Sequence, residues 1–196
     1  MEMLKSLADF LSVRDAPESC DLIFVLAGRP ERKPHGWQLF QSGMAPRLIF
    51  SIGRYEIRQT ALQPVEIPGL MELREKTPPA QRHFWTDFQA GRTTISRAGL
   101  AKTNTYWELY GLGSYLAASN PRRIAIVSTS IHLRRVRFCC RRISFFKSMS
   151  LLYVPVPEDK SSFHRNGWWK HTDQVSYLLS EYAKLAAYYV VYGWRQ

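Results

Sequence analysis

The amino-acid sequence predicts an α/β domain in which helices flank a doubly wound, mostly parallel sheet. Stretches with strand character alternate with stretches of helical spacing along most of the chain. Residues 21–27 and 124–128 are continuous apolar runs, as expected for parallel strands buried on both faces. These runs end at Gly28 and at Thr129-Ser130, where the chain can leave the sheet.

Size and composition indicate a single globular unit. With 196 residues the chain can bury one good core, so we expect one domain over residues 1–196. Apolar residues make up 45% and charged residues 22%, which excludes a disordered chain. The three cysteines include the neighbours Cys139 and Cys140, so no disulfide framework is expected and reducing surroundings are favoured.

The charge balance favours an anionic partner. Lys and Arg number 27 against 16 acidic residues, giving a net charge of +11. A phosphate compound, a nucleic acid or an anionic lipid surface is therefore favoured over a cation, and the alternative is an ordinary basic surface. Glu2, Lys5 and Asp9 interrupt the N-terminal segment, which predicts neither a signal peptide nor a membrane span. We expect a soluble, cytoplasmic protein whose membrane contact, if any, is peripheral.

The first third of the chain predicts a βαβ unit preceded by a helix. Residues 3–13 have the apolar spacing of a short amphipathic helix. After the strand at 21–27, a helix is expected at about 34–42 with Gly43 at its C-cap, and then a strand at 47–52. The crossover between two such parallel strands is right-handed.

The middle of the chain, residues 54–100, has a weaker pattern. Residues 70–76 predict a short helix. Residues 80–90 carry apolar side chains at helical spacing, and residues 92–96 predict a short strand. His83 lies beside the apolar stripe, where a structural role and a position facing a cleft are both open.

The last part of the chain continues the alternation. Residues 103–118 predict a helix that Thr103 or Asn104 would cap. Gly111 and Gly113 weaken this helix intrinsically, so either the backbone packs closely there or the helix is irregular. The remaining expected elements are the strand at 124–128, an arginine-rich helix that ends near Arg142, a strand at 151–156 and a long helix at 174–192.

The strand ends predict where a ligand would bind. In doubly wound folds, ligands lie outside the carboxyl ends of the strands. This places Gly28, Gly53 and residues 128–132 along one rim of the sheet. The helix after residue 128 would offer free backbone N–H groups beside His132 and Arg135, which suits an anionic group.

The order of motifs resembles that of a known family. The matching residues are Arg32, Gly36, Leu39, Gly43, Ala45-Pro46, Ser51, Gly53, Asn104, Thr105, Thr129, Ser130, His132 and Arg135. On these residues the chain resembles, over about residues 21–156, the envelope-biogenesis and vancomycin-sensitivity proteins known as domain of unknown function 218, the ElyC, SanA and YdcF family. That family has a Ser-Glu-Ala helix after the second strand, for which we identify no counterpart near residues 54–60. It often has a glutamate two residues after Asn-Thr, where this chain has Trp107.

The resemblance implies a Rossmann-like fold. Some members are anchored in the bacterial envelope and influence peptidoglycan or lipid-carrier metabolism, and a cytoplasmic member binds S-adenosylmethionine. A link to cell-envelope biogenesis is therefore implied, with S-adenosylmethionine as a candidate cofactor.

His132 and Arg135 are the candidate catalytic residues. The planar guanidinium of Arg135 would clamp a phosphate or carboxylate, and the alternative is a solvated helix face, since other arginines are near. His132 would serve as a general acid or base, and the alternative is a neutral side chain that orients a loop.

Candidate ligand-binding residues line the same rim. Their hydroxyls would bind phosphate oxygens or, alternatively, cap helices, and Arg32 would reach the rim from the first crossover. The set is Gly28, Arg32, Ser51, Gly53, Asn104, Thr105, Thr129 and Ser130. No metal-ligand spacing is present in the sequence.

The leading hypothesis is a domain that binds a phosphate-bearing or nucleotide-like small molecule at the rim. If it is an enzyme, hydrolysis or transfer at a phosphate ester or phosphoanhydride is the expected chemistry. The alternative is a non-enzymatic module that docks on an anionic membrane or a protein partner through its basic surface. Nucleic-acid binding ranks last, because the arginines are not interleaved with stacking aromatic residues.

Overall fold

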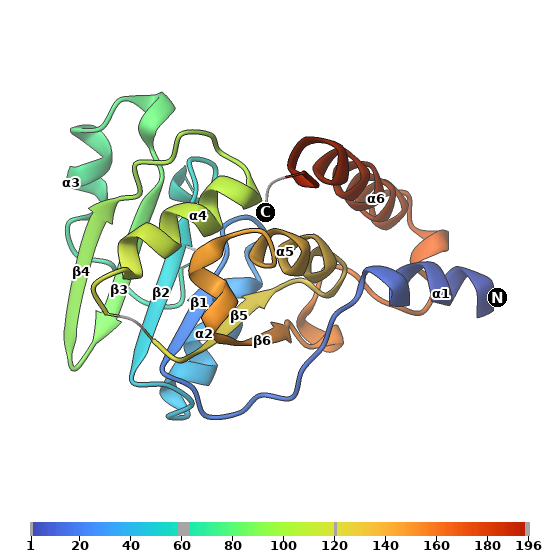
Figure 1. Cartoon of the computed structure of the whole chain (residues 1–196), viewed down its shortest axis with the longest axis horizontal. Helices are drawn as coiled ribbons and strands as arrows, with labels where there is room; N and C mark the ends of the chain where they lie inside the picture. Colours follow the sequence, from blue (N-terminus) through green and yellow to red (C-terminus); the bar gives the residue numbers. More distant parts are fainter. Residues whose placement is uncertain (1, 59–62, 120, 195–196) are drawn as a thin grey trace.

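A six-stranded sheet crosses the molecule in the part of the chain that the computed structural model describes, residues 2–58, 63–119 and 121–194 (Figure 1). The strand order is β4-β3-β2-β1-β5-β6, in which β1, β2, β5 and β6 are parallel and β3 and β4 antiparallel. The strands are β1 Leu22–Val25, β2 Arg47–Ile52, β3 Phe84–Gln89, β4 Arg92–Arg97, β5 Arg123–Ser128 and β6 Ser150–Pro155. The expected Rossmann-like α/β fold with a mostly parallel sheet is confirmed.

Helices cover both faces of the sheet (Figure 1). They are α1 Glu2–Leu11, α2 Arg32–Gln41, α3 Leu70–Glu75, α4 Thr105–Leu116, α5 Leu133–Cys140 and α6 Thr172–Tyr192. In the described residues, one hydrophobic cluster joins α1, α4, α5 and α6 to one face, and a second joins α2 and α3 to the other. None of the described helices combines the length and apolar character needed to cross a bilayer.

The centre of the sheet positions the predicted rim. Val25 of β1 pairs with Phe50 of β2 on one side and with Val127 of β5 on the other. The carboxyl ends of these parallel strands therefore finish together. Because the chain leaves β1 to one side and later returns on the other, the gap between β1 and β5 is the topological switch point of the fold.

Residues 80–90 do not form the helix that their apolar spacing predicts, and this expectation is wrong. Residues 84–89 are strand β3, which turns through Ala90 and Gly91 into β4. Both turn residues have positive φ, 49° and 74°, as a two-residue hairpin turn requires. Phe84 to Phe88 are all buried between neighbouring strands and helices, so the alternation that marks a half-exposed strand is absent.

Helix α4 forms as predicted and explains its two glycines. The side chain of Asn104 caps it by accepting the N–H of Trp107 at 3.2 Å. A Cβ on Gly111 would lie 2.6 Å from Leu100 Cδ2, and one on Gly113 would lie 3.0 Å from Phe145 Cβ. Of the two alternatives for these glycines, the structure shows close backbone packing.

Helix α2 approaches β1 more closely than a side chain at residue 36 allows. A Cβ on Gly36 would lie 2.3 Å from Val25 Cγ2, in the core beside the end of β1. We predict that Gly36→Ala lowers the free energy of unfolding by about 1–3 kcal/mol, because the extra methyl group overpacks the interior. Chemical denaturation measures this, with the exposed Gln41→Ala on the same helix as the control. Equal stabilities of the two variants would contradict the close packing.

Candidate functional site

Arg32 joins the ends of two central strands at the switch point. Its Nη1 donates to the Ala27 carbonyl after β1, and its Nη2 donates to Thr129 Oγ1 after β5 at 3.0 Å. Gly28 has φ of +126°, and a Cβ there would lie 3.0 Å from Arg32 Nη1. The predicted Gly28, Arg32 and Thr129 therefore meet, and the glycine makes room for the guanidinium.

Arg32 is a buried cation without an ion pair among the described residues. The residue is 3% exposed, and its Nε is buried without a hydrogen-bond partner. Burial raises the pKa of Glu108, and the charge of Arg32 partly offsets that rise. Positive potential therefore remains at the switch point.

Helix α6 covers the end of β5. The hydroxyl groups of Tyr177 and Thr129 are 2.6 Å apart, and the guanidinium carbon of Arg29 lies 4.2 Å from the centre of the Tyr177 ring. Tyr177 and Arg29 thus occupy the space above Thr129, where the strand-end crevice was expected to accept a ligand.

His132 lies between two hydroxyl groups. Its Nδ1 is 2.7 Å from Ser128 Oγ and its Nε2 is 3.3 Å from Thr105 Oγ1. Burial, with the charges of Arg135 and Arg32, lowers the pKa of His132 well below its usual value. The imidazole is therefore neutral near pH 7, and both of its nitrogens are engaged in the interior.

Arg135 forms an internal ion pair. Nε and Nη2 donate to the carboxylate of Glu181 on α6 at 2.9 to 3.0 Å, and Nη1 donates to Thr105 Oγ1. Burial by itself would lower the pKa of Arg135, but the Glu181 carboxylate outweighs it and the pKa is raised. The bidentate geometry predicted for a ligand is thus used to dock α6 on α5.

Asn104 and Ser130 are directed away from this cluster. Asn104 caps α4, and its Nδ2 donates to the Tyr192 hydroxyl at 3.2 Å. Ser130 lines a separate hollow that it shares with charged residues of α1 and of the segment after β6. The structure therefore brings most, but not all, of the predicted rim residues together.

Two buried glutamates at the rim were missed in the sequence. Glu56 accepts the Gly53 N–H through Oε2 at 2.9 Å and pairs with Lys33 of α2 through Oε1. Glu56 lies in the segment 54–60, in which the sequence analysis identified no counterpart of the Ser-Glu-Ala helix. Residues 59 and 60 of this segment lie outside the described residues. Glu108 Oε1 accepts the Ala27 N–H at 2.8 Å. Their spacing in the sequence could have revealed both glutamates. Glu56 follows the predicted rim residue Gly53 by three positions, and Glu108 follows Thr105 by three.

Ser51 and His83 form a second buried polar pair. Ser51 Oγ lies 2.7 Å from Nε2 of His83, which precedes β3. A Cβ on Gly53 would be 3.4 Å from Ala27 Cβ and 4.0 Å from His83 Cε1, so this pair adjoins the ends of β1 and β2. Burial lowers the pKa of His83 to about 4, so its ring is neutral near pH 7. The sequence left a structural role and a position facing a cleft open for His83, and in the structure His83 lines a cavity.

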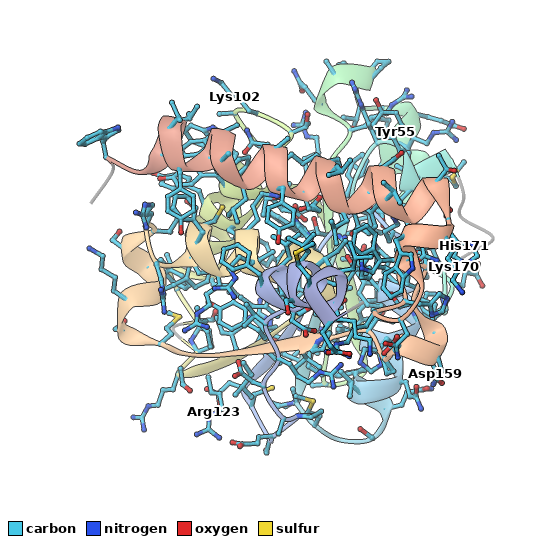
Figure 2. The ribbon with its side chains drawn as sticks, turned by 90° about the vertical axis from the view of Figure 1, so that its right-hand side faces the viewer. Tyr55, Lys102, Arg123, Asp159, Lys170 and His171 are labelled. Carbon is cyan, nitrogen blue, oxygen red and sulfur yellow. The ribbon has the colours of Figure 1, made fainter. Side chains whose placement is uncertain are left out.

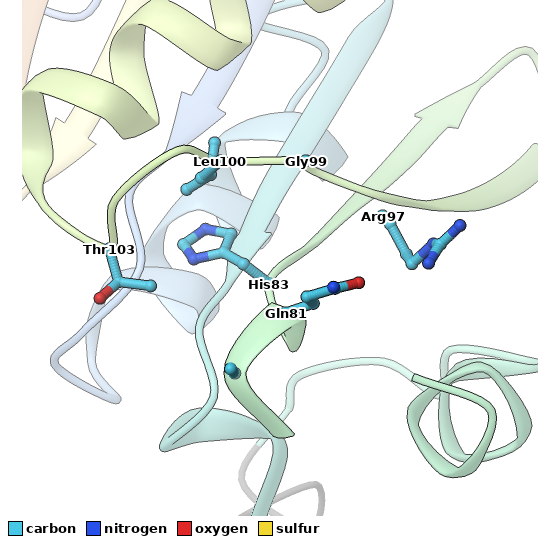
Figure 3. Close-up of a pocket in the computed structure, with 7 residues that line it drawn as sticks. Gln81, His83, Arg97, Gly99, Leu100 and Thr103 are labelled. Carbon is cyan, nitrogen blue, oxygen red and sulfur yellow. The ribbon is translucent and has the colours of Figure 1, made fainter. Parts of the chain in front are cut away.

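The cavity beside His83 has a volume of about 540 Å³ (Figure 3). The ring of His83 points toward Thr103, between the segment with Gly99 and Leu100 and the turn with Gln81. Its lining residues are Ala80, Gln81, His83, Arg97, Gly99, Leu100 and Thr103. Among the described residues, no group of three or more His, Cys, Asp or Glu is placed to hold a metal ion.

Comparisons with protein-family models, with curated proteins and with solved structures find no match to this chain.

The Arg135–Glu181 pair leads to a stability prediction. Glu181→Leu leaves the guanidinium buried without its partner, so we expect it to lower the free energy of unfolding by about 3–5 kcal/mol. The double variant Arg135→Met with Glu181→Leu removes both charges, and we expect it to be more stable than the single variant. Denaturant titration of all three proteins measures this. A double variant less stable than Glu181→Leu would contradict the assignment.

Proposed function

We propose that the protein binds a small phosphate-bearing or nucleotide-like molecule in the cavity at the strand-end rim. The observation that carries the proposal is this cavity, which adjoins the end of β2 and has His83, the partner of the buried Ser51, in its wall. Its volume of about 540 Å³ lies in the range usual for small-molecule sites.

Charge and hydrogen-bonding groups around the cavity favour an anion. Arg97 is an exposed cation in its lining, and Gln81 and Thr103 add neutral hydrogen-bonding groups. A phosphate group would receive charge-assisted hydrogen bonds from Arg97.

The same proposal includes kinship with the ElyC, SanA and YdcF proteins and a role in cell-envelope metabolism. Its supports are the motif order in the sequence and the Rossmann-like sheet that this kinship implies. S-adenosylmethionine belongs among the ligands to be tested for the same reason.

Replacing Arg97 tests the site. We expect Arg97→Gln to weaken binding of pyrophosphate or ATP about 10-fold or more, since hydrogen bonds to charged groups contribute about 1.5–3 kcal/mol. Titration calorimetry with pyrophosphate, ATP and S-adenosylmethionine measures this. Arg92→Gln, at the opposite end of β4, is the matched control and should bind as the original protein does. Binding of none of these probes, or equal losses in both variants, would overturn the proposal.

A second candidate function is docking on an anionic membrane, favoured by exposed apolar side chains of α6 and α1. Figure 2 shows the side of the molecule on which these two helices lie. Seven apolar side chains on this side are 50% to 90% exposed and together form the outer apolar surface. They are Met3, Phe10, Leu179, Tyr189, Val190, Val191 and Trp194. Phe10 stacks on Tyr182 at 5.9 Å, which joins the α1 and α6 parts of this surface.

The charges beside the outer apolar surface complement anionic headgroups. Arg134 lies over the Phe10 ring at 4.5 Å, and Arg142 lies over the Phe138 ring at 4.1 Å. Lys184 is half-exposed on α6 itself. With the net charge of +11, this pattern fits an amphipathic surface on an anionic bilayer better than an uncharged partner.

Vesicle binding tests the second candidate. We expect co-sedimentation with phosphatidylcholine vesicles that contain phosphatidylglycerol, a smaller bound fraction in high salt, and loss of binding in Val190→Glu. Met71→Glu, an exposed position on α3, is the control. Failure of the original protein to sediment with the vesicles would contradict membrane docking. A dimer that Val190→Glu abolishes would also contradict it and would assign the outer apolar surface to contact with a second copy of the chain.

A further inference from the structure

A row of buried polar side chains leads from the cavity to the carboxyl group of Glu108. His83 lines the cavity, and its Nε2 is 2.7 Å from Ser51 Oγ. The Ser51 side chain also acts on the Glu108 carboxyl group, where it partly offsets the rise in pKa that burial causes. Ser51 has no exposed surface, and His83 is the member of this row that lines the cavity.

The imidazole of His83 is oriented with one nitrogen inward. Ser51 engages Nε2, while Nδ1 has no hydrogen-bond partner among the described residues. The ring also makes an edge contact with Trp85, with centroids 5.5 Å apart. His83 is therefore held in one orientation, in which Nδ1 is available to a water molecule or a ligand in the cavity.

Glu108 is the carboxyl group at the inner end of this row. Burial raises its pKa, while Ser51, the Ala27 N–H, Arg32 and Lys33 lower it in part. The charges that act on His83 are Glu56 and Lys33, and burial lowers its pKa. Burial therefore favours the uncharged form of both side chains.

We propose that His83, Ser51 and Glu108 form a proton relay for hydrolysis of a phosphoanhydride bound in the cavity. This inference rests on the proposed function and specifies the substrate class as a nucleoside polyphosphate or a similar phosphoanhydride. His83 is the catalytic base, and Ser51 and Glu108 act through it.

The relay carries the proton of the attacking water. The water oxygen forms a bond to phosphorus while the bond from phosphorus to the bridging oxygen breaks, and that electron pair leaves with the departing phosphate. The water proton moves to His83 Nδ1, the Nε2 proton moves to Ser51 Oγ, and the Ser51 proton moves to the Glu108 carboxylate. The reverse path later releases the proton to solvent.

The chemistry of the lining selects an anhydride over an ester. Among the described residues that line the cavity, none is a carboxylic acid that could protonate a departing alkoxide. A departing phosphate, with a pKa of about 6, needs no such proton at neutral pH. Arg97 can stabilise the charge on it.

Steady-state assays of phosphate release from ADP, ATP and pyrophosphate, with magnesium present, test the relay. We expect His83→Gln, Ser51→Ala and Glu108→Gln each to lower kcat about 10²-fold or more, with KM changed less than about threefold. His35→Gln is the matched control, because it alters a buried histidine of α2 away from the cavity. Circular dichroism establishes that the variants are folded, and Ser51→Ala removes a single oxygen atom if the larger changes prevent folding.

The pH profile separates a relay from a structural role. Glu108 accepts the proton only when ionised, so we expect kcat to rise with pH through the pKa of Glu108 and this rise to vanish in Glu108→Gln. Binding of the probes without phosphate release, or release that persists in all three variants, would overturn the relay and leave the proposed binding function standing. Failure of the original protein to bind any of the probes would overturn both.

Discussion

The buried guanidinium of Arg32 is the interaction on which the rim depends. It bonds the carbonyl after β1 and the hydroxyl after β5, and so closes the switch point between two parallel strands. Gly28 lacks a Cβ where one would crowd this guanidinium, and Glu108 accepts the neighbouring Ala27 N–H. Desolvating an unpaired charge costs several kcal/mol, so this arrangement requires the hydrogen bonds and the nearby carboxyl group that the fold supplies.

Other buried cations are compensated inside the protein. Lys33 pairs with Glu56, which also accepts the Gly53 N–H at the end of β2. Arg135 pairs with Glu181 and holds α6 over α5. Burying a charged group is costly unless it is paired, and these ion pairs supply the partners. Because Arg135 is bound to Glu181, its guanidinium is not available to an external anion. Arg97 and His83 at the cavity then become the groups best placed to meet a ligand.

Much of the fold could be predicted because its signals are local. The runs at 21–27, 47–52 and 124–128 have the composition of buried strands, and Asn104 has the position and chemistry of a helix cap. The segment at 80–90 shows the limit of such signals. Its apolar spacing suits a helix and a fully buried strand equally, and only pairing with β2 and β4 decides between them.

The sequence by itself determined the strand–helix order and, through the rule for parallel sheets, the rim on which Arg32, Ser51, Thr105, Thr129 and His132 lie. Only the tertiary structure decided the role of each side chain there. Glu181 reaches Arg135 from 46 residues further along the chain, and His83 meets Ser51 across 32. Ion pairing and burial depend on distances in space, and side chains this far apart in the chain carry no periodic pattern that records them.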